Sequence, residues 1–400
     1  MKWASTVSDA PQLATAIADA GAALRLQLGG ATPDLILAFI SAHHHGEYER
    51  VPELIAAQFG NGLLLGCSAG GVIGGGKEIE QRPGVSLTAA TLPGVDVAPF
   101  HVDAGAMPTP NDPPAAWERS LAVPNAIDPN ATPHFLLLPD PFSIDSEVLL
   151  RGLDRAYPAS TKLGGLASGA QQPGANALFL GRALHRAGVV GVALSGDIAV
   201  DTIVAQGCRP IGQPMFITRC QQNLLWELDG QPAMQVLQDL YEQLEPEDQA
   251  LIQHSLFLGI VMSEHQQQYR QGDFLIRNLI GTDPTRTALA VGALLRENSV
   301  VQFHLRDAKT SSEDLRQLLS RYRTQLSTAR PRGALLFSCL GRGAHLYGRP
   351  DHDTDAFRQH IGDVPLGGFF CNGEIGPVHG SSFLHGYTSS FGVFRRRLSD

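Results

Sequence analysis

The chain has 400 residues, of which 43% are hydrophobic and 17% charged, and this balance excludes a disordered chain, a collagen and a coiled coil. The length favours two domains, each with a substantial buried core, over one compact domain. The formal net charge of −9 gives no general attraction to nucleic acid or to an anionic membrane, so we expect no nucleic-acid partner.

The N-terminal region predicts no targeting segment. Residues Met1 to Asp9 lack the apolar run of a secretory signal, and no later stretch approaches the roughly 20 apolar residues that span a bilayer. We therefore predict a cytoplasmic protein with no membrane insertion. The first element is a helix, because apolar residues from Leu13 to Leu28 recur at helical spacing; Ser8 or Asp9 is its expected N-cap.

A β-α-β unit comes next. The unbroken apolar run from Asp34 to Ile40 is typical of a strand that is covered on both faces in a parallel sheet. A helix after Pro52 and a strand from Leu63 to Leu65 complete the unit. This second strand runs directly into the glycine-rich segment from Leu65 to Gly76.

The same pattern of strand, helix and glycine-rich segment occurs twice more, at similar spacing. The second unit comprises His134 to Leu138, Ser143 to Tyr157 and Leu163 to Gly169, and the third comprises Gly333 to Ser338, His352 to His360 and Leu366 to Pro377. Three matching units indicate a repeated architecture.

Antiparallel strands accompany these units. After each glycine-rich segment comes a β-rich stretch: Val85 to His101, Ala177 to Ala205 and Phe383 to Phe394. The turn Ser195-Gly196-Asp197 predicts a hairpin between the strands on either side of it. The segment from Ala104 to Pro133 is rich in proline and predicts an irregular surface connection.

A change in composition between Leu225 and Pro232 predicts a domain boundary. Two helices follow, one from Met234 to Leu244 and one beginning near Pro246. Further on we expect strands at Ser255 to Met262, Phe274 to Ile280, Leu289 to Leu295 and Val300 to Leu305, and a helix from Leu315 to Leu326. The predicted fold class is α/β (mixed α+β), with two domains built from repeated β-α-β-glycine-turn units and additional antiparallel strands.

The glycine-rich segments are the main functional signal. Without side chains, main-chain N–H groups can approach a ligand at the carboxyl ends of parallel strands, which suits a carboxylate or another anion. None of the segments matches the dinucleotide or nucleoside triphosphate motifs. An equally weighted interpretation is that the glycines allow tight turns and close packing of the sheets.

The cysteines and polar residues beside the glycines allow more than one interpretation. The five cysteines include no CxxC pair, so we expect neither a disulfide framework nor a thiolate zinc site. Cys67 and Cys371 could be nucleophiles, although packing in the core is the commoner role of such a residue. Arg342, between two glycines, could bind a carboxylate or serve only as an ordinary surface cation.

No metal or cofactor is predicted. The run His43-His44-His45 and the acidic group around His352 have no known metal-ligand spacing. A loop after a strand and an acidic helix N-terminus explain them more simply. The residues predicted to line a ligand site are Gly66, Cys67, Ser68, Gly70, Gly71, Gly164, Gly165, Ser168, Arg342, Cys371, Asn372 and Glu374.

Several segments resemble those of FIST proteins, in which a FIST N-terminal domain precedes a FIST C-terminal domain. They are LLLGCSAGGVIGGG (Leu63 to Gly76), LPGVDVAPFH (Leu92 to His101), and GRGAHLYGRPDHD with PLGGFFCNGEIGP (Gly341 to Pro377). The resemblance implies a FIST N-terminal domain over 31–225 and a FIST C-terminal domain over 226–380. It also implies a sensory role in intracellular signal transduction, with an amino acid or related metabolite as ligand, and it brings no catalytic residues.

We therefore predict a small-ligand-binding sensory protein. Main-chain N–H groups and Arg342 would receive the ligand carboxylate, while Asn372 and Glu374 would take its amino group. Because no kinase, methyl-accepting, cyclase or F-box segment is recognised, we expect a separate signalling protein to receive the output. The alternatives are a Cys-dependent hydrolase or transferase using Cys67 or Cys371, and a protein-interaction scaffold.

Overall fold

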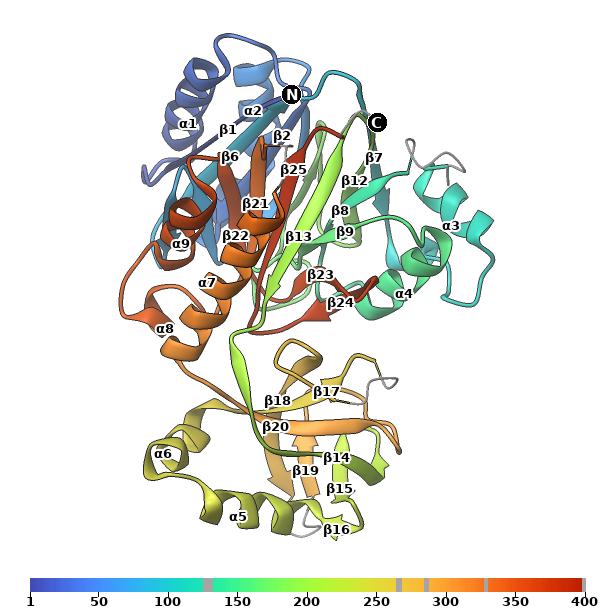
Figure 1. Cartoon of the computed structure of the whole chain (residues 1–400). Coiled ribbons are helices and arrows are strands. Elements are labelled where there is room, and N and C mark those ends of the chain that lie inside the picture. Colours follow the sequence, from blue (N-terminus) through green and yellow to red (C-terminus); the bar gives the residue numbers. More distant parts are fainter. Residues whose placement is uncertain (125–131, 264–267, 284–287, 327–329, 398–400) are drawn as a thin grey trace. The chain divides into compact units, whose positions relative to one another are not determined.

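The computed structural model describes residues 1–124, 132–263, 268–283, 288–326 and 330–397 (Figure 1). It divides into two compact units. Unit 1 comprises Met1–Val204, Arg316–Leu384 and Thr388–Asp400, and unit 2 comprises Ala205–Leu315 and His385–Tyr387. These units are defined by spatial contacts, and each contains more than one segment of the sequence. The predicted boundary between residues 225 and 226 instead divides the sequence at one point, and it stays a prediction.

In the described part of unit 1, the strands form three six-stranded sheets of the same design. The first sheet has the order β1 (Lys2–Ser8), β6 (Val85–Thr91), β2 (Leu35–Ser41), β3 (Leu63–Ala69), β10 (Leu178–Leu180) and β11 (Ala183–His185). The second has β7 (Val95–Val102), β12 (Val189–Gly196), β8 (His134–Pro139), β9 (Lys162–Gly165), β23 (Glu374–Val378) and β24 (Ser381–His385). The third has β13 (Ala199–Ala205), β25 (Ser389–Arg395), β21 (Gly333–Cys339), β22 (Leu366–Cys371), β4 (Gly71–Gly74) and β5 (Lys77–Glu80).

A parallel strand pair lies at the centre of each sheet, and the predicted fold class with its three β-α-β units is confirmed. The pairs are β2 with β3, β8 with β9, and β21 with β22. The helices that join them are α2 (Val51–Phe59), α4 (Ser146–Ala156) and α9 (His352–Ile361). A further helix precedes the first strand of each pair: α1 (Leu13–Leu28), α3 (Pro114–Leu121) and α7 (Ala308–Gln325).

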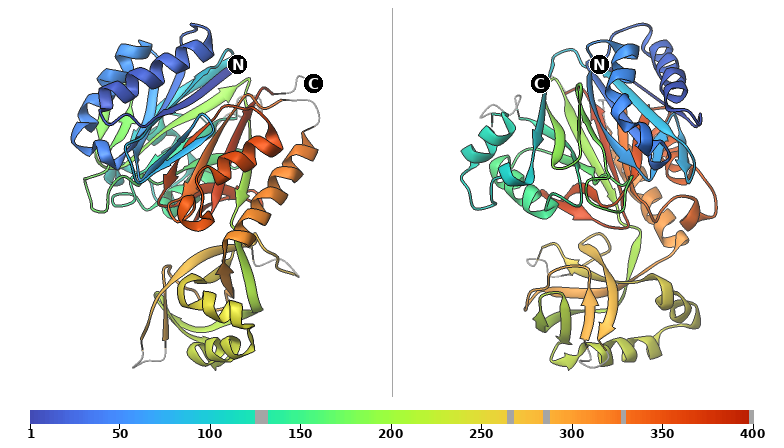
Figure 2. Two further views of the ribbon diagram at one scale, coloured as in Figure 1. Left: turned by 90° about the vertical axis from the view of Figure 1, so that its left-hand side faces the viewer. Right: turned by 180° about the vertical axis from the view of Figure 1, so that it is seen from behind.

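The three sheets share one core and carry their helices on the opposite faces (Figures 1 and 2). Phe39, Leu136 and Phe337, one from each sheet, belong to a single buried apolar cluster. Apolar residues of α1 and α2 pack on the other face of the first sheet, and those of α3 and α4 on the second. On the third sheet, Phe357 of α9 stacks on Phe391 of β25. Burial on both faces explains the unbroken apolar runs of the central strands.

The structure can therefore be described as three modules that exchange strands. Module 1 runs from β1 to β6, module 2 from β7 to β12, and module 3 comprises β13, α7 and the elements from β21 to β25. The hairpin that follows each central pair joins the sheet of another module. Strand β4 of module 1 pairs with β22, β10 of module 2 pairs with β3, and β23 of module 3 pairs with β9.

One glycine in each module lies at the same place in the central pair. Gly66, Gly164 and Gly368 are register partners of Ala38, Leu137 and Leu336. A Cβ atom on Gly66, Gly164 or Gly368 would lie 2.0, 1.9 or 1.9 Å from the carbonyl oxygen of that partner. These glycines therefore lie within strands and permit close strand packing, which favours the packing interpretation for these positions.

Most of unit 2 lies in the sequence between β13 and α7; it also includes the first part of α7, up to Leu315, and His385–Tyr387. Its strands close into a barrel because β14 (Cys208–Gln221) pairs with both β20 (Val300–Arg306) and β15 (Leu224–Leu228). The other barrel strands are β17 (Leu256–Val261), β18 (Phe274–Asp283) and β19 (Ala288–Val291), and β16 (Gln231–Pro232) pairs with β15. The two predicted helices are α5 (Ala233–Gln243) and α6 (Pro246–Ser255).

Three local expectations are wrong. Helix α1 begins after Gln12 with no side-chain cap, because Lys2–Ser8, which includes the expected cap Ser8, is a strand that pairs with β6. The proline-rich segment contains α3, whose Trp117 is buried against Gly152; residues 125–131 of that segment lie outside the described residues. Strands β12 and β13 flank the turn at Gly196 but belong to different sheets, so they form no hairpin.

Candidate functional site

The carboxyl ends of the three central strand pairs meet at Ser168. The Ser168 hydroxyl accepts a hydrogen bond from the N–H of Gly70 at 2.9 Å and donates one to the carbonyl oxygen of Phe370 at 2.5 Å. The N–H of Asn372 donates to the carbonyl oxygen of Leu166 at 3.3 Å. The three glycine-rich segments of the sequence are therefore brought together, one from each module.

Several main-chain groups of these segments bond to each other. The N–H of Leu166 donates to Gly373 at 2.9 Å, and the N–H of Ser168 donates to Ser68 at 3.1 Å. Gly165 packs against Cys371, whose Sγ would lie 2.9 Å from an added Cβ. Gly71 is the register partner of Phe370 in the pairing of β4 with β22. Main-chain amides that the sequence predicts to face a ligand are therefore hydrogen-bonded within the protein itself.

Cys67 and Ser68 lie inside the core at the end of β3. Cys67 is fully buried, and burial raises the pKa of its thiol well above the ordinary value. The Ser68 hydroxyl donates to the amide oxygen of Asn176 at 2.9 Å, and the Asn176 amide donates to Asp140 at 2.9 Å. Ser68 therefore belongs to a buried polar network, and a Cys67 thiolate is strongly disfavoured.

Arg342 is also fully buried, and its guanidinium is held by Asp353. The Nε atom lies 3.0 Å from Oδ2 of Asp353, and Nη2 donates to the hydroxyl of Tyr347. His352 and Ser389 contact the same carboxylate, at 2.8 and 2.5 Å. Arg342 thus fixes the segment between β21 and α9 from inside, instead of lying on a flexible surface loop.

Glu374 and Cys371 form a second buried pair in the third module. The Cys371 Sγ lies 3.5 Å from Oε1 of Glu374 and 3.4 Å from the carbonyl oxygen of Ser338, both of which can accept its proton, and the N–H of Thr388 donates to Oε2 of Glu374 at 3.0 Å. Burial, and then the neighbouring carboxylate, raise the pKa of the Cys371 thiol well above its ordinary value. Asn372, between the two, is exposed. Whether the twelve predicted residues bind a ligand stays a prediction.

A hollow of about 930 Å³ lies beside this meeting point, at the carboxyl end of β2. Module 1 contributes Ala42 and His45, from the 3-10 helix η1 (Ala42–Arg50), and module 2 contributes Arg186 and the loop from Gly169 to Ala175. Gly169 directly follows Ser168 and packs on Ser68, whose Cβ would lie 2.5 Å from an added Cβ. The hollow therefore adjoins the predicted segments.

Arg186 supplies the positive charge of this hollow. Its Nη1 donates to the carbonyl oxygen of Asn176 at 3.3 Å, and its Nη2 lies 3.1 Å from Oε1 of Glu49. The Arg186 side chain is 35% exposed, and that of Glu49 is 78% exposed. No motif of the sequence indicates Arg186, because it lies outside the glycine-rich segments, and the sequence predicts His45 only as part of a loop after a strand.

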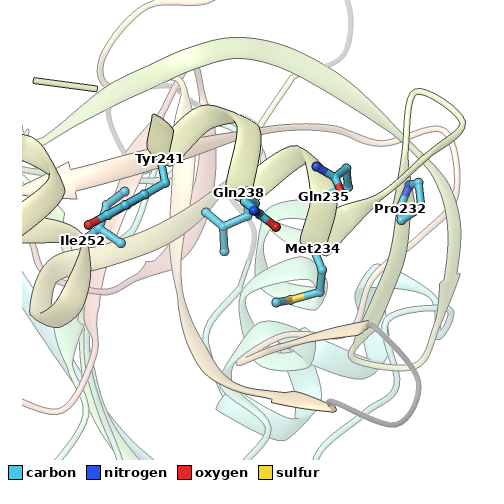
Figure 3. Close-up of a pocket in the computed structure, with 7 residues that line it drawn as sticks. Pro232, Met234, Gln235, Gln238, Tyr241 and Ile252 are labelled. Carbon is cyan, nitrogen blue, oxygen red and sulfur yellow. The ribbon is translucent and has the colours of Figure 1, made fainter. Parts of the chain in front are cut away.

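Two further hollows lie away from the strand ends. One of about 600 Å³ in unit 2 is mostly apolar and is lined by Pro232 of β16 and by side chains of α5 and α6 (Figure 3). Its lining residues are Pro232, Met234, Gln235, Leu237, Gln238, Tyr241 and Ile252. A smaller one, of about 250 Å³, lies near Gly75, Arg358 and Leu366 at the amino end of β22. Neither combines a cation with the carboxyl end of a parallel strand.

Metal-binding clusters and membrane-spanning helices are both absent from the described residues. No group of three or more His, Cys, Asp or Glu side chains there is arranged to hold a metal ion. Within the same ranges, no helix has both the length and the apolar character needed to cross a bilayer.

Two models of one protein family match successive parts of the chain. The model of the FIST N domain matches residues 34–231, and that of the FIST C domain matches residues 233–377. An uncharacterized protein of Mycobacterium tuberculosis is 37% identical over 388 residues, which cover 97% of this chain and 98% of the relative. An uncharacterized protein of Mycobacterium bovis is 34% identical over 388 residues, 97% of each chain.

More distant similarities are limited. An F-box/LRR-repeat protein of Arabidopsis thaliana is 24% identical over 184 residues, 41% of this chain and 34% of that protein. A solved structure of cyanuric acid hydrolase covers 99% of this chain and 100% of its own, at 9% identity. Its TM-score of 0.33 is too low to carry an argument.

Proposed function

The chain belongs to the FIST family, whose domains are generally regarded as small-ligand sensory domains in signalling, and we propose that it binds a small carboxylate, such as an amino acid, in the Arg186 hollow. In this proposal the protein acts in the cytoplasm, and a separate signalling protein receives the output. Gly169, at the end of the second predicted glycine-rich segment, lines this hollow, whereas none of the twelve predicted site residues does.

The observation that carries the proposal is the position of Arg186 in the hollow. An arginine guanidinium binds a carboxylate through two parallel hydrogen bonds. Besides the carbonyl oxygen of Asn176, Arg186 contacts the carboxylate of Glu49, which is largely exposed, and such exposed ion pairs contribute only about 0–1 kcal/mol. A ligand carboxylate can therefore replace Glu49 at small cost.

The other lining residues suit the remainder of an amino acid. The side chains of Gln171 and Gln172 are exposed on the loop and offer amide oxygens to an ammonium group. His45 lies across the hollow on module 1, and its Nδ1 lies 3.2 Å from the carbonyl oxygen of Ala42. A ligand that contacts both sides would link two modules, and its binding would thereby favour one of their arrangements.

The test is a binding titration of the full chain against a panel of amino acids, by calorimetry. For an amino acid that binds, Arg186→Ala should weaken binding by about 10- to 100-fold, because it removes a charge-assisted contact. Arg182→Ala is the matched control: Arg182 is exposed, lies in the same hairpin and does not line the hollow. Equal affinity of the wild type and the Arg186→Ala variant would refute the proposed site.

A further inference from the structure

Cys339 and Cys371 are neighbours across the parallel pair of β21 and β22. They are register partners at the carboxyl ends of these strands. Two residues earlier, the register partners Phe337 and Phe369 hold their ring centroids 5.8 Å apart, so partners at alternate positions project to the same face. Adjacent strands lie about 4.8 Å apart, within the roughly 4.4–6.8 Å between Cα atoms that a disulfide requires.

The two thiols have unequal surroundings. Cys339 is partly exposed, its sulfur accepts the N–H of Gly341 at 3.4 Å, and the guanidinium of Arg342 acts on it electrostatically. Cys371 is fully buried, and its Sγ lies 3.5 Å from Oε1 of Glu374 and 3.4 Å from the carbonyl oxygen of Ser338. A partly exposed thiol near a positive charge is the typical setting of a peroxide-reactive cysteine, and such residues often have a second cysteine beside them.

We propose that Cys339 and Cys371 form a redox-active pair in which a hydroperoxide oxidises Cys339 and Cys371 then closes a disulfide. In the first step the Cys339 sulfur attacks the peroxide, the O–O bond breaks, and a sulfenic acid and one water (an alcohol from an organic peroxide) form. In the second step Cys371 gives its proton to Glu374 and attacks the sulfenic sulfur. The S–O bond breaks, and the leaving hydroxide takes up the proton that Glu374 received and departs as water, which returns Glu374 to its carboxylate form. Overall, the thiols lose two electrons and two protons to the peroxide.

The burial of Cys371 suits the thiol that closes the disulfide, and not the thiol that first reacts with the peroxide. Its high thiol pKa makes it a poor first target, and it is shielded from solvent. Once Cys339 is oxidised, the reacting sulfur lies on the adjacent strand, so no solvent access is needed. The carboxylate of Glu374 then serves as the base that removes the thiol proton.

The test treats the reduced full chain with hydrogen peroxide, alkylates the remaining thiols and maps peptides by mass spectrometry without reduction. The wild type should yield a peptide pair joined through Cys339 and Cys371. Cys371→Ser should instead accumulate a sulfenic acid at Cys339 that dimedone traps, and Cys339→Ser should give neither product. Cys339 should react at least about tenfold faster than Cys220, a partly exposed thiol of unit 2 that serves as the internal control.

The wild-type arm needs no substitution, so the proposal can be tested even where a serine variant fails to fold. Peroxide treatment of the wild type that joins no Cys339–Cys371 peptides would overturn the proposal, and so would oxidation of Cys339 no faster than that of Cys220. Glu374→Gln tests the second step separately. It should prolong the life of the trappable sulfenic acid without slowing its formation, and an unchanged lifetime would remove Glu374 from the mechanism.

Discussion

The side-chain hydroxyl of Ser168 accepts the main-chain N–H of Gly70 at 2.9 Å, and so links module 2 to module 1. The same hydroxyl donates to Phe370 of module 3. We predict that Ser168→Ala lowers the free energy of unfolding by about 1–3 kcal/mol, because two main-chain groups lose their partner. Urea denaturation followed by circular dichroism measures this change.

The control for Ser168 is Ser120→Ala. The Ser120 hydroxyl is exposed and makes a long bond of 3.4 Å to Ala106, so its loss should change stability by no more than about 0.5 kcal/mol. Equal effects of the two substitutions would mean that the hydroxyl of Ser168 does not hold the modules together.

The paired glycines give the second prediction. Gly164 and Gly368 have φ of +151° and +145°, and an added Cβ would lie 1.9 Å from a carbonyl oxygen. Gly164→Ala or Gly368→Ala should therefore cost more than about 4 kcal/mol or abolish folding. Gly46→Ala is the control, since a Cβ there meets no atom within 4 Å, and its effect should stay within about 1 kcal/mol. Soluble yield and thermal melting distinguish these outcomes, and a folded, stable Gly164→Ala protein would contradict the packing role.

A third prediction concerns the buried pair of Arg342 and Asp353. Removing the guanidinium by Arg342→Met leaves the Asp353 carboxylate buried without its cation, which should cost about 3–5 kcal/mol. The exposed pair of Arg349 and Asp355 is the control, and Arg349→Met should cost no more than about 1 kcal/mol. Chemical denaturation of both variants tests the difference.

The same pair should protect the fold against acid. Burial alone would raise the pKa of Asp353, but the Arg342 guanidinium outweighs it and holds that pKa well below the ordinary value. The stability from this group is then present above the unfolded value of about 3.9, and is lost as the pH falls toward the folded value. Asp353→Asn should make the free energy of unfolding depend less on pH below about pH 4. An unchanged pH dependence in this range would contradict the prediction.

Glu78 should act in the opposite direction. Burial, and then the charge of Asp353, raise its pKa to about 8, and Asp351 and Glu80 add to the shift. Between about pH 4.5 and 8 the folded state holds a proton that the unfolded state has lost, so stability falls as the pH rises. Glu78→Gln should reduce that slope. Denaturation midpoints near pH 5 and pH 8 measure it, and equal slopes in wild type and variant would contradict the shift.

The central strand pairs could be predicted from the sequence because burial on both faces leaves a clear local signal. The run from Asp34 to Ile40 needs no knowledge of its neighbours to be recognised as a strand. The order of strands in the sheets has no such signal. The sequence of Leu178–Leu180 is equally compatible with pairing to β9, which precedes it, and with pairing to β3, its actual partner.

The candidate site was harder to predict because Arg186, its charged residue, lies outside the glycine-rich segments. Glycine-rich segments mark both ligand-binding backbone and close packing, and only coordinates reveal that Gly66 faces the carbonyl of Ala38. Arg342 stands between glycines but is buried, whereas Arg186 lies in an ordinary stretch and lines the hollow. Burial of a cation depends on distant carboxylates such as Asp353, which local sequence does not reveal.

The strand exchange among the modules affects how the chain can fold while the ribosome synthesises it. When β3 has emerged from the exit tunnel, its neighbour β10 has not been made, and β9 must wait for β23, about 210 residues later in the nascent chain. During synthesis, the first and second sheets therefore each have an unpaired edge strand, to which another polypeptide could add by mistake. Production of this protein in a cell should accordingly depend on chaperones that shield those edge strands until translation has passed β23.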